Sequence, residues 1–558
     1  MTKVQACETT ALKCAQRLVT TGYFGQLRRN YLIQLVNDDE DYKEACSPQA
    51  PAGAKTAFEV KRQTSWVTHG VLPVAVFRTL LAAWAKAGHL AAAGQATHAN
   101  FTVDVGITFE GLLQLGTHEA LTDLFRRKAP AYAQGAYWRA ASRLGDSGPS
   151  APLKWNERYQ KKNLHAVLIF HTSRSAEEAT VEKRILEFEA DILCKLAATL
   201  ASNLQVMKRD WIESSQKVGK AKEIHFGLVD GLSMPRYHGV DSEVELDVEA
   251  EVNRHLPGEL LLGYNKNDGS NPWLVPNAVV RASRPATISP LSVQEIYGSF
   301  FKDGAFGVLR RMYQNVPKFE STLMALARAG HGAHSLEYYC AWLKAKMLGR
   351  WPNGERVLGE IDPSIQGHLT LLQAARMIAV YEQGNSATSN NFVYQMDRQG
   401  LQCPFGAHIR RMNPRDDPVA PRLRRPLLRR GLPYGEKFDL SKKNEADDRG
   451  LLGLFFCTSI EEQFEHLLGN WANNNPMGMP FTQAGKDPLI AAREPNDPKG
   501  LRNSFAIPNK DAPPLFLNGL QTFVETRGTS YAFFPSLNAL QKISDGAVGS
   551  QTAFIRSP

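Results

Sequence analysis

The chain has 558 residues, of which 43% are hydrophobic and 22% are charged, and its 65 basic and 56 acidic side chains leave a net charge of +9 at pH 7. This length exceeds a single typical core, so we expect two domains with insertions, and the composition is that of a globular protein rather than of a disordered chain. The basic excess is mild and comes without interleaved aromatic residues or a recognisable binding motif, which argues against a nucleic-acid binder.

The cysteines and the apolar stretches indicate in which cellular compartment the protein is expected. Seven cysteines are scattered along the chain without a CxxC pair, so they offer no zinc or disulfide framework. The N-terminus lacks an apolar core of signal-peptide length, and no window is apolar enough to span a membrane. We therefore expect a cytoplasmic protein with reduced thiols and no membrane partner.

The first half of the chain predicts strands and helices in the order β-α-β-β-α-β. Alternating or short apolar runs predict the strands, and helical spacing predicts a helix over about 74–92. A second helix opens at the capping-box pair Ser175 and Glu178. This order is the ferredoxin-like arrangement, and its predicted strands are 31–36, 101–109, 164–170 and about 203–212.

The second half repeats that order without a residue-level repeat. A capping box at Ser459 and Glu462 opens its last long helix. We therefore expect an α+β fold of two duplicated ferredoxin-like domains, 1–255 and 256–558, divided where Gly, Pro and Asn punctuate the sequence. The predicted elements are a strand at 305–313, helices at 316–329 and 335–348, an irregular arm at about 350–425, and strands at 426–430, 451–458 and 530–536.

A first candidate functional stretch, FGLVDGLSMPRY, covers residues 226–237. Asp230 lies between Gly227 and Gly231, and glycine permits a tight turn and a close backbone approach. An aspartate in a turn is common by itself. The alternative is a carboxylate that a bare backbone presents to a ligand.

A second stretch, CPFGAHIRRMNPR, covers residues 403–415. Small and apolar residues surround His408, and three arginines (Arg410, Arg411 and Arg415) follow within seven positions. An imidazole can ligate haem iron, and arginines can bind the propionate carboxylates as bidentate partners. Taken alone, such a stretch more often holds an ordinary loop histidine.

Together the two stretches resemble the dye-decolourising peroxidases. That family carries a GxxDG motif, which matches Gly227 to Gly231, and a haem-binding histidine in a segment like that of His408. Its arginine on the opposite haem face matches Arg429 in RRGLPYG, 21 positions after His408. Further segments that look like family segments are 257–264, 348–355, 390–397, 450–457 and 530–537.

The resemblance implies a peroxidase that binds one haem b per chain, mainly in the C-terminal domain. It would reduce hydrogen peroxide and oxidise dyes, phenols or similar one-electron donors through a ferryl intermediate. His408 would ligate the iron, Asp230 would shuttle the proton and Arg429 would stabilise developing charge. Arg415 would bind the haem, and Leu454 and Phe456 would wall the distal pocket.

The sequence leaves several points open. The second ring nitrogen of His408 should donate to an acceptor. Asp487 is a candidate for this acceptor, although an aspartate at such a position is more often a plain turn residue. A haem-handling protein with little peroxidase turnover is the alternative function. The physiological reductant, any surface Tyr or Trp relay, the role of 110–163 and the formation of a homo-oligomer are not readable.

Overall fold

The computed structural model describes the chain in segments. These are residues 16, 27–36, 68–90, 101–160, 164–172, 212–214, 223–238, 253–273, 298–330, 332, 334–357, 390, 392, 394, 397–417, 424–439, 448–474, 485–493 and 503–549.

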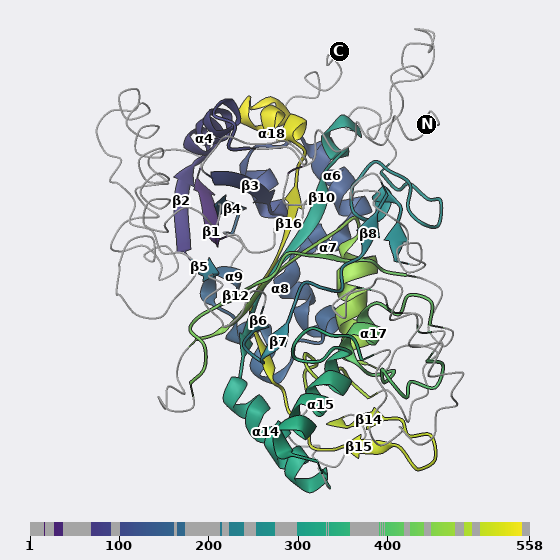
Figure 1. Cartoon of the computed structure of the whole chain (residues 1–558). Coiled ribbons are helices and arrows are strands. Elements are labelled where there is room, and N and C mark those ends of the chain that lie inside the picture. The colour runs from purple at the N-terminus through teal and green to yellow at the C-terminus, as the bar shows by residue number, and fades with distance from the viewer. Residues whose placement is uncertain are drawn as a thin grey trace.

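One large, mostly antiparallel sheet runs through the centre of the molecule (Figure 1). Its strand order is β11-β13-β10-β16-β3-β4-β1-β2, with β12 pairing with β13 and β5 pairing with β1. The strands are β1 (Leu27–Val36), β2 (Thr68–Pro73), β3 (Phe101–Ile107), β4 (Ala166–Thr172), β5 (Ile212–Ser214), β10 (Ala305–Gln314), β11 (Leu428–Arg429), β12 (Leu432–Tyr434), β13 (Gly450–Cys457) and β16 (Val524–Phe534).

Each half of the chain contributes one side of this sheet. The strands of the first unit lie in the order β3-β4-β1-β5, and those of the second in the order β11-β13-β10-β16. Numbered along the chain within each unit, both orders read 2-3-1-4, which is the order of a ferredoxin-like unit. The two units meet where β16 pairs with β3 at Phe533 and Ile107. The α+β class is thus confirmed. The predicted helix after Ser175 lies outside the described residues, and the boundary at 255/256 stays a prediction.

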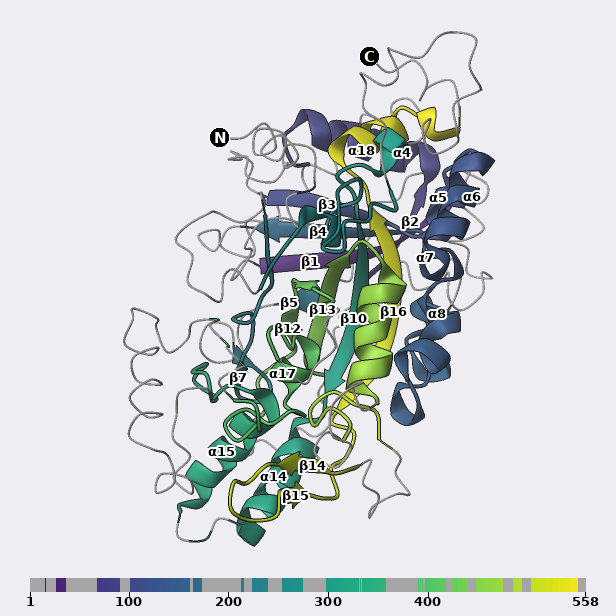
Figure 2. The ribbon, with the colours of Figure 1, turned by 90° about the vertical axis from the view of Figure 1, so that its right-hand side faces the viewer.

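Helices cover both faces and the two ends of the sheet (Figure 2). Helix α18 packs on α4 at one end, and α14 and α15 lie at the other (Figure 1). The π-helix η8 opens at Ser459, whose hydroxyl accepts a hydrogen bond from the N–H of Glu462, which confirms that capping pair. The bounds are α4 (Val74–Lys86), α14 (Val316–Gly330), α15 (Leu336–Leu348), η8 (Ile460–Ala472) and α18 (Leu537–Ser544).

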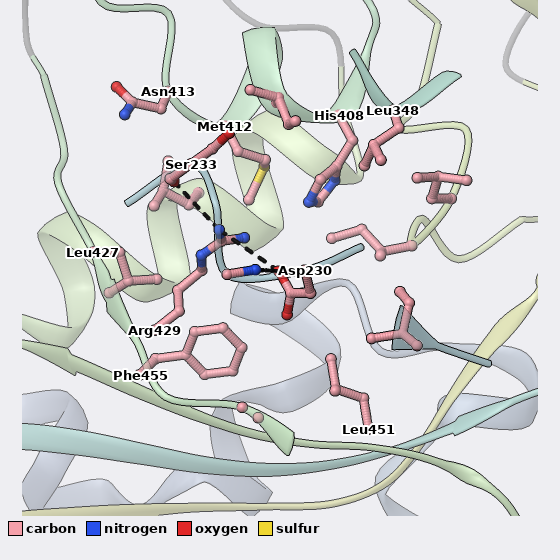
Figure 3. A pocket seen from close by; sticks show the side chains of 18 of the residues that line it. Asp230, Ser233, Leu348, His408, Met412, Asn413, Leu427, Arg429, Leu451 and Phe455 are labelled. Carbon is pink, nitrogen blue, oxygen red and sulfur yellow. Dashed lines mark hydrogen bonds and ion pairs between the residues drawn. The ribbon is translucent and has the colours of Figure 1, made fainter. Parts of the chain in front are cut away.

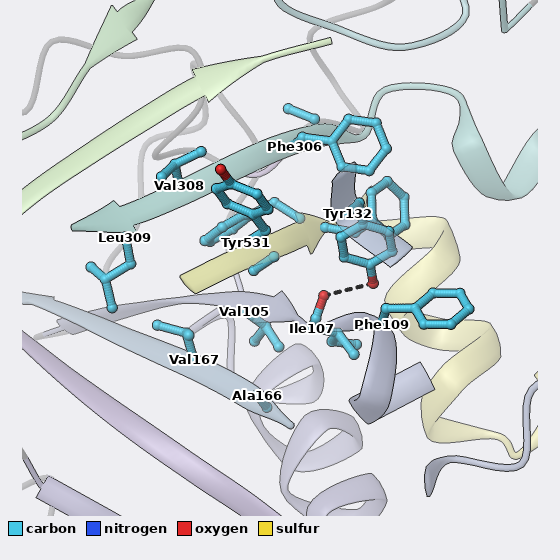
Figure 4. Close-up of a cluster of buried hydrophobic side chains, with 14 of the residues drawn as sticks. Val105, Ile107, Phe109, Tyr132, Ala166, Val167, Phe306, Val308, Leu309 and Tyr531 are labelled. Carbon is cyan, nitrogen blue, oxygen red and sulfur yellow. Dashed lines mark hydrogen bonds between the residues drawn. The ribbon is translucent and has the colours of Figure 1, made fainter. Parts of the chain in front are cut away.

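The segment at 110–160, for which the sequence predicted nothing, consists largely of short helices beside β16 (Figure 2). Their apolar residues join the core that Figure 4 shows, where the Tyr132 hydroxyl donates to the Ile107 carbonyl at 2.9 Å. These helices are α5 (Phe109–Gln114), α6 (Glu119–Lys128), α7 (Pro130–Gln134), α8 (Ala136–Arg139) and α9 (Glu157–Gln160).

Strand register decides which side chains share a face of the sheet. Val308 on β10 pairs with Phe455 on β13 and with Tyr531 on β16, so these three side chains lie on one face. Leu309 and its partner Leu454 lie on the other face. Within the described ranges, no helix is long and apolar enough to cross a bilayer.

Candidate active site

A large cavity lies between one face of the sheet, the GxxDG loop and helices α15, α17 (His408–Met412) and η8. The space within it is about 1560 Å³, a figure that includes its opening to solvent. Most lining side chains are apolar, and His408, Asp230 and Arg429 all line it. Figure 3 shows these three directed into the same space, with Leu451 and Phe455 on the sheet side. The structure therefore brings the three predicted catalytic and ligand residues together.

His408 is the first residue of α17, and a buried carboxylate fixes its imidazole. Its Nδ1 lies 2.8 Å from Oδ2 of Asp487, while Oδ1 of Asp487 accepts from the N–H groups of Leu489 and Ile490 at 2.9 and 3.0 Å. Burial works to raise the pKa of Asp487, but the charges of His408 and Arg411 and the hydrogen bonds to it hold that pKa below its usual value. An ionised Asp487 accepts the Nδ1 proton and leaves Nε2 of His408 to face the cavity. The predicted contact between His408 and Asp487 is thus present in the structure.

Asp230 follows a short hairpin of β6 (Glu223–Ile224) and β7 (Leu228–Val229). Gly227 and Gly231 have φ of 69° and 80°, so both need the conformational freedom of glycine. The Gly231 N–H donates to Oδ1 of Asp230 at 2.7 Å. Oδ2 makes no hydrogen bond to the described residues, and the side chain keeps 35% of its surface exposed. A small molecule in the cavity can therefore reach this carboxylate.

Arg429 approaches Asp230 from strand β11. Its Nη2 lies 3.8 Å from Oδ1 of Asp230, and the Arg429 side chain is 28% exposed. The same Nη2 donates to the Ser233 carbonyl at 3.3 Å, which ties Arg429 to the loop that carries Asp230. The carboxylate and the guanidinium thus form a loose, reachable pair.

The sheet wall of the cavity differs from the sequence-based choice. Leu451, Gly453 and Phe455 line the cavity, whereas Leu454 and Phe456 are fully buried in the core on the opposite face of β13. The prediction of Leu454 and Phe456 is corrected accordingly. Alternation shows which residues of a strand share a face, but both faces of β13 are apolar, so the pattern could not indicate which face meets the cavity.

The arginines after His408 also lie elsewhere than predicted. Arg415 does not line the cavity, and its guanidinium binds the carbonyl and the side-chain oxygen of Asn390. Arg410 pairs with two buried aspartates, and Arg411 donates to carbonyl groups of the chain around it. The choice of Arg415 as a cofactor ligand is therefore corrected, because its guanidinium is directed to Asn390 and not into the cavity.

Two arginines that the sequence analysis did not single out line the cavity instead. Arg350, which follows α15, donates to Oγ of Ser233 at 3.0 Å and to the Gly354 carbonyl at 2.9 Å. Arg425 pairs with Glu462 at 2.7 Å. Arg350 lies in segment 348–355, which resembles a segment of the peroxidase family, and this resemblance is the sequence feature that could have identified it. Buried and half-buried arginines at one cavity are suited to carboxylate groups of a ligand.

Comparison with known proteins shows which proteins this chain is similar to. No family model matches the chain. The chain is 27% identical over 465 residues to a dye-decolorizing peroxidase of Mycetinis scorodonius, a match that covers 80% of this chain and 77% of that protein. It is also 27% identical over 458 residues to a multifunctional dye peroxidase of an Amycolatopsis species, covering 79% of this chain and 81% of the relative. The relatives that this chain matches over most of its length are thus dye-decolourising peroxidases.

Solved structures of dye-decolourising peroxidases share the fold. A complex with 2,6-dimethoxyphenol superposes with a TM-score of 0.63 at 22% identity, covering 96% of this chain and 99% of that one. A fungal enzyme from Auricularia auricula-judae gives a TM-score of 0.59 at 20% identity with the same coverage.

Dye-decolourising peroxidases are haem enzymes, and the residues that line the cavity of this chain fit a haem. The walls are apolar, one imidazole nitrogen faces the cavity, and arginines are available for carboxylates. Among the described residues, no group of three or more His, Cys, Asp and Glu could hold a metal by itself. A single imidazole suits an iron whose other ligands come from a porphyrin.

Proposed function

We propose that this chain is a haem-dependent peroxidase that reduces hydrogen peroxide and oxidises dyes, phenols or similar one-electron donors. The observation that supports this most directly is the convergence of Asp230 and Arg429 with His408 on one cavity. A haem carrier would need the imidazole and the apolar walls, but it would have no use for an acid and a cation paired in the same space.

His408 would bind the haem iron through Nε2, with one haem b per chain. Asp487 would keep Nδ1 protonated and make the imidazole a stronger electron donor. Arg350 and Arg425 would neutralise the haem carboxylates. The bound haem supplies the redox chemistry with peroxide, and the protein supplies orientation and proton transfer.

Asp230 would carry the proton. Hydrogen peroxide must lose a proton from one oxygen and gain a proton on the other as the O–O bond breaks. Oδ2 of Asp230 is free to take and return that proton, because only Oδ1 is engaged by Gly231. Such a shuttle contributes roughly 10²–10⁴-fold to a rate.

Arg429 would stabilise the negative charge that develops on the departing oxygen. Its guanidinium lies on the Asp230 side of the cavity, 3.8 Å from that carboxylate. Charge stabilisation and proton transfer would therefore act at neighbouring oxygens of one bound peroxide.

The reductant would be a phenol or a dye. A related solved structure holds 2,6-dimethoxyphenol, and the related proteins are dye-decolorizing peroxidases. We also propose a cytoplasmic location, which the free thiols of Cys340, Cys403 and Cys457 support. A homo-oligomer stays a prediction.

The deciding experiment compares the parent protein with Asp230→Asn, both loaded with haem. The variant should bind haem with the parent absorption spectrum but react with one equivalent of hydrogen peroxide roughly 10²–10⁴-fold more slowly. The rate is followed at the Soret band in a stopped-flow instrument. Asp511→Asn, an exposed aspartate outside the cavity, is the matched control.

Two results would count against the proposal. If Asp230→Asn reacts with peroxide at the rate of the parent, Asp230 is not the proton shuttle. If His408→Ala keeps the Soret spectrum of the parent, His408 is not the iron ligand. Steady-state turnover of 2,6-dimethoxyphenol separates a peroxidase from a haem-handling protein, since the latter would show little turnover.

A further inference from the structure

Helix α15 contacts the two sides of the cavity that carry the candidate catalytic groups. Figure 1 and Figure 2 both show it beneath the hairpin of β6 and β7, which leads to Asp230, and beneath α17, which begins at His408. Its last residue, Leu348, lines the cavity itself (Figure 3). The hydrogen bonds that join α15 to these two sides come from two lysines of the helix.

Lys344 joins α15 to the turn between β6 and β7. Its Nζ donates to the Phe226 carbonyl at 3.1 Å and pairs with Glu320 of α14 at 2.7 Å. A Cβ on Gly227, the next residue of this turn, would lie 3.6 Å from the same Nζ. Only 13% of the Lys344 side chain is exposed, so its ammonium group acts from within the protein. Asp230 follows Phe226 by four positions, and the contact therefore fixes the hairpin that presents this carboxylate.

Lys346 joins the same helix to the segment that precedes α17. Its Nζ donates to the carbonyl groups of Leu401 and Gln402 at 3.0 and 2.7 Å, seven and six positions before His408. Only 4% of Lys346 is exposed, and hydrogen bonds from a charged donor are roughly twice as strong as neutral ones. Residues two positions apart on a helix point to different sides. The two lysines can therefore hold opposite sides of the cavity from one helix.

The C-terminal end of α15 contacts both sides again. Gly349 has a φ of 101°, and a Cβ there would lie 3.3 Å from Cβ of Ile409 and from Sγ of Cys403. The bare backbone thus lets the α17 side pack closely against the end of the helix. The next residue, Arg350, donates to Oγ of Ser233, just beyond the GxxDG motif.

We propose that α15 sets the separation between Asp230 and His408, with Lys344 and Lys346 as its positioning residues. Neither lysine lines the cavity, so each acts through the segment that it holds. Peroxide would react between Asp230 and the haem that His408 binds, where a misplacement of about 1 Å can cost on the order of 10²-fold in rate. A helix suits this role, because its backbone hydrogen bonds fix its length. The inference rests on the proposed peroxidase function.

The test compares Lys344→Met with Lys346→Met in the full haem-loaded chain, since both remove an ammonium group from α15. Lys344→Met should react with one equivalent of hydrogen peroxide about tenfold more slowly than the parent, followed at the Soret band. It should release haem to apomyoglobin at the rate of the parent. Lys346→Met should release haem about tenfold faster, because the support of the iron ligand is lost.

Lys344→Arg is the matched rescue, because arginine keeps a cationic donor for the Phe226 carbonyl and for Glu320, and it should recover most of the peroxide rate. A parent peroxide rate in Lys344→Met, or a Lys344→Arg protein as slow as Lys344→Met, would overturn the role of Lys344. Lys346→Gln, which keeps a donor of shorter reach, replaces Lys346→Met if the latter does not fold.

Haem release tests the other end of α15 without any reaction of peroxide. A parent release rate in the Lys346 variant would overturn the role of Lys346. Equally fast release from the Lys344 and Lys346 variants would overturn their separate roles, because it would show a general loosening of the cavity. The Soret response of the parent to peroxide is recorded first: a parent without any response overturns the proposed function instead, and the release rates still decide the role of Lys346.

Discussion

His408 and Asp487 act as one unit at the scale of single residues. Asp487 is fully buried, yet its carboxylate makes bonds to an imidazole and to two backbone N–H groups. These partners compensate the cost of burying a charge. The chemistry of the imidazole therefore depends on a residue 79 positions away in the chain.

Asp487→Asn tests this dependence. The amide oxygen can still accept from the N–H groups of Leu489 and Ile490, so the loop should fold, but the amide nitrogen meets Nδ1 of His408 as a donor. The imidazole becomes a weaker electron donor to iron, so the haem reduction potential should rise by on the order of 59 mV, a tenfold change for one electron. Spectroelectrochemistry of the haem-loaded variant measures the shift. A potential equal to that of the parent would show that Asp487 only shapes the loop.

Asp487 could be named from the sequence only as one of two readings. An aspartate before a proline looks the same in the sequence whether it only forms a turn or also binds a histidine. Only the tertiary contact with His408 distinguishes the two roles. The propionate role of Arg415 failed for a related reason. A basic run shows that cations are present, but it does not show that Asp397, Asp417 and Asn390 already bind them.

The helix that carries His408 is short, and its position rests on one buried arginine. Arg410 pairs with Asp397 at 3.0 Å and with Asp417 at 2.6 Å. Its guanidinium also lies between the rings of Tyr394 and Phe405, at 4.6 and 4.4 Å from their centroids. Five residues of helix cannot hold their own position. This cluster therefore fixes α17 and, with it, the imidazole.

We expect Arg410→Ala to lower the free energy of unfolding by about 3–5 kcal/mol, because it leaves two buried carboxylates without their cation. Urea unfolding of the haem-free protein measures this loss. Arg398→Ala removes an exposed arginine nearby and should stay within about 0.5 kcal/mol of the parent. Equal stabilities of the two variants would show that the cluster does not hold α17.

Elements with a clear period were predictable, and elements fixed by tertiary packing were not. The strands at 305–314 and 450–457 and the helices at 316–330 and 336–348 match the apolar periods of the sequence. The short helices at 109–160 bury a few residues each, against β16 or against one another. Each is too short to show the repeating apolar pattern by which a helix is predicted. The cavity-facing side of β13 was missed because both of its sides are apolar.

At the scale of the whole molecule, two duplicated units share one sheet, and the candidate site draws on both halves of the chain, with Asp230 from the first and His408 and Arg429 from the second. The repeated order of elements predicted the duplication. The pairing of Phe533 with Ile107, which joins the units, could not be predicted, because it links strands that are more than 400 positions apart.

Two buried histidines, one at each end of the segment 225–255, make the stability of the whole molecule depend on pH. Burial lowers the pKa of His225 to about 4 and that of His255 to about 3, from 6.5. Both stay neutral in the folded protein between pH 6.5 and 4, whereas the unfolded chain binds a proton at each. The unfolded state is therefore favoured as the pH falls, by up to about 1.4 kcal/mol per pH unit for each histidine.

His225→Gln should flatten this dependence, because the replacement cannot titrate and can still donate to the Tyr434 carbonyl that His225 contacts at 2.7 Å. The free energy of unfolding is measured in urea from pH 7 to 4.5 on haem-free protein, so that iron ligation by His408 does not contribute. All other titrating groups are common to parent and variant, and the difference in slope isolates His225. A decline of up to about 1.4 kcal/mol per pH unit should disappear from the variant. Identical slopes would mean that His225 binds its proton equally well in both states, and its burial would then carry no pH dependence.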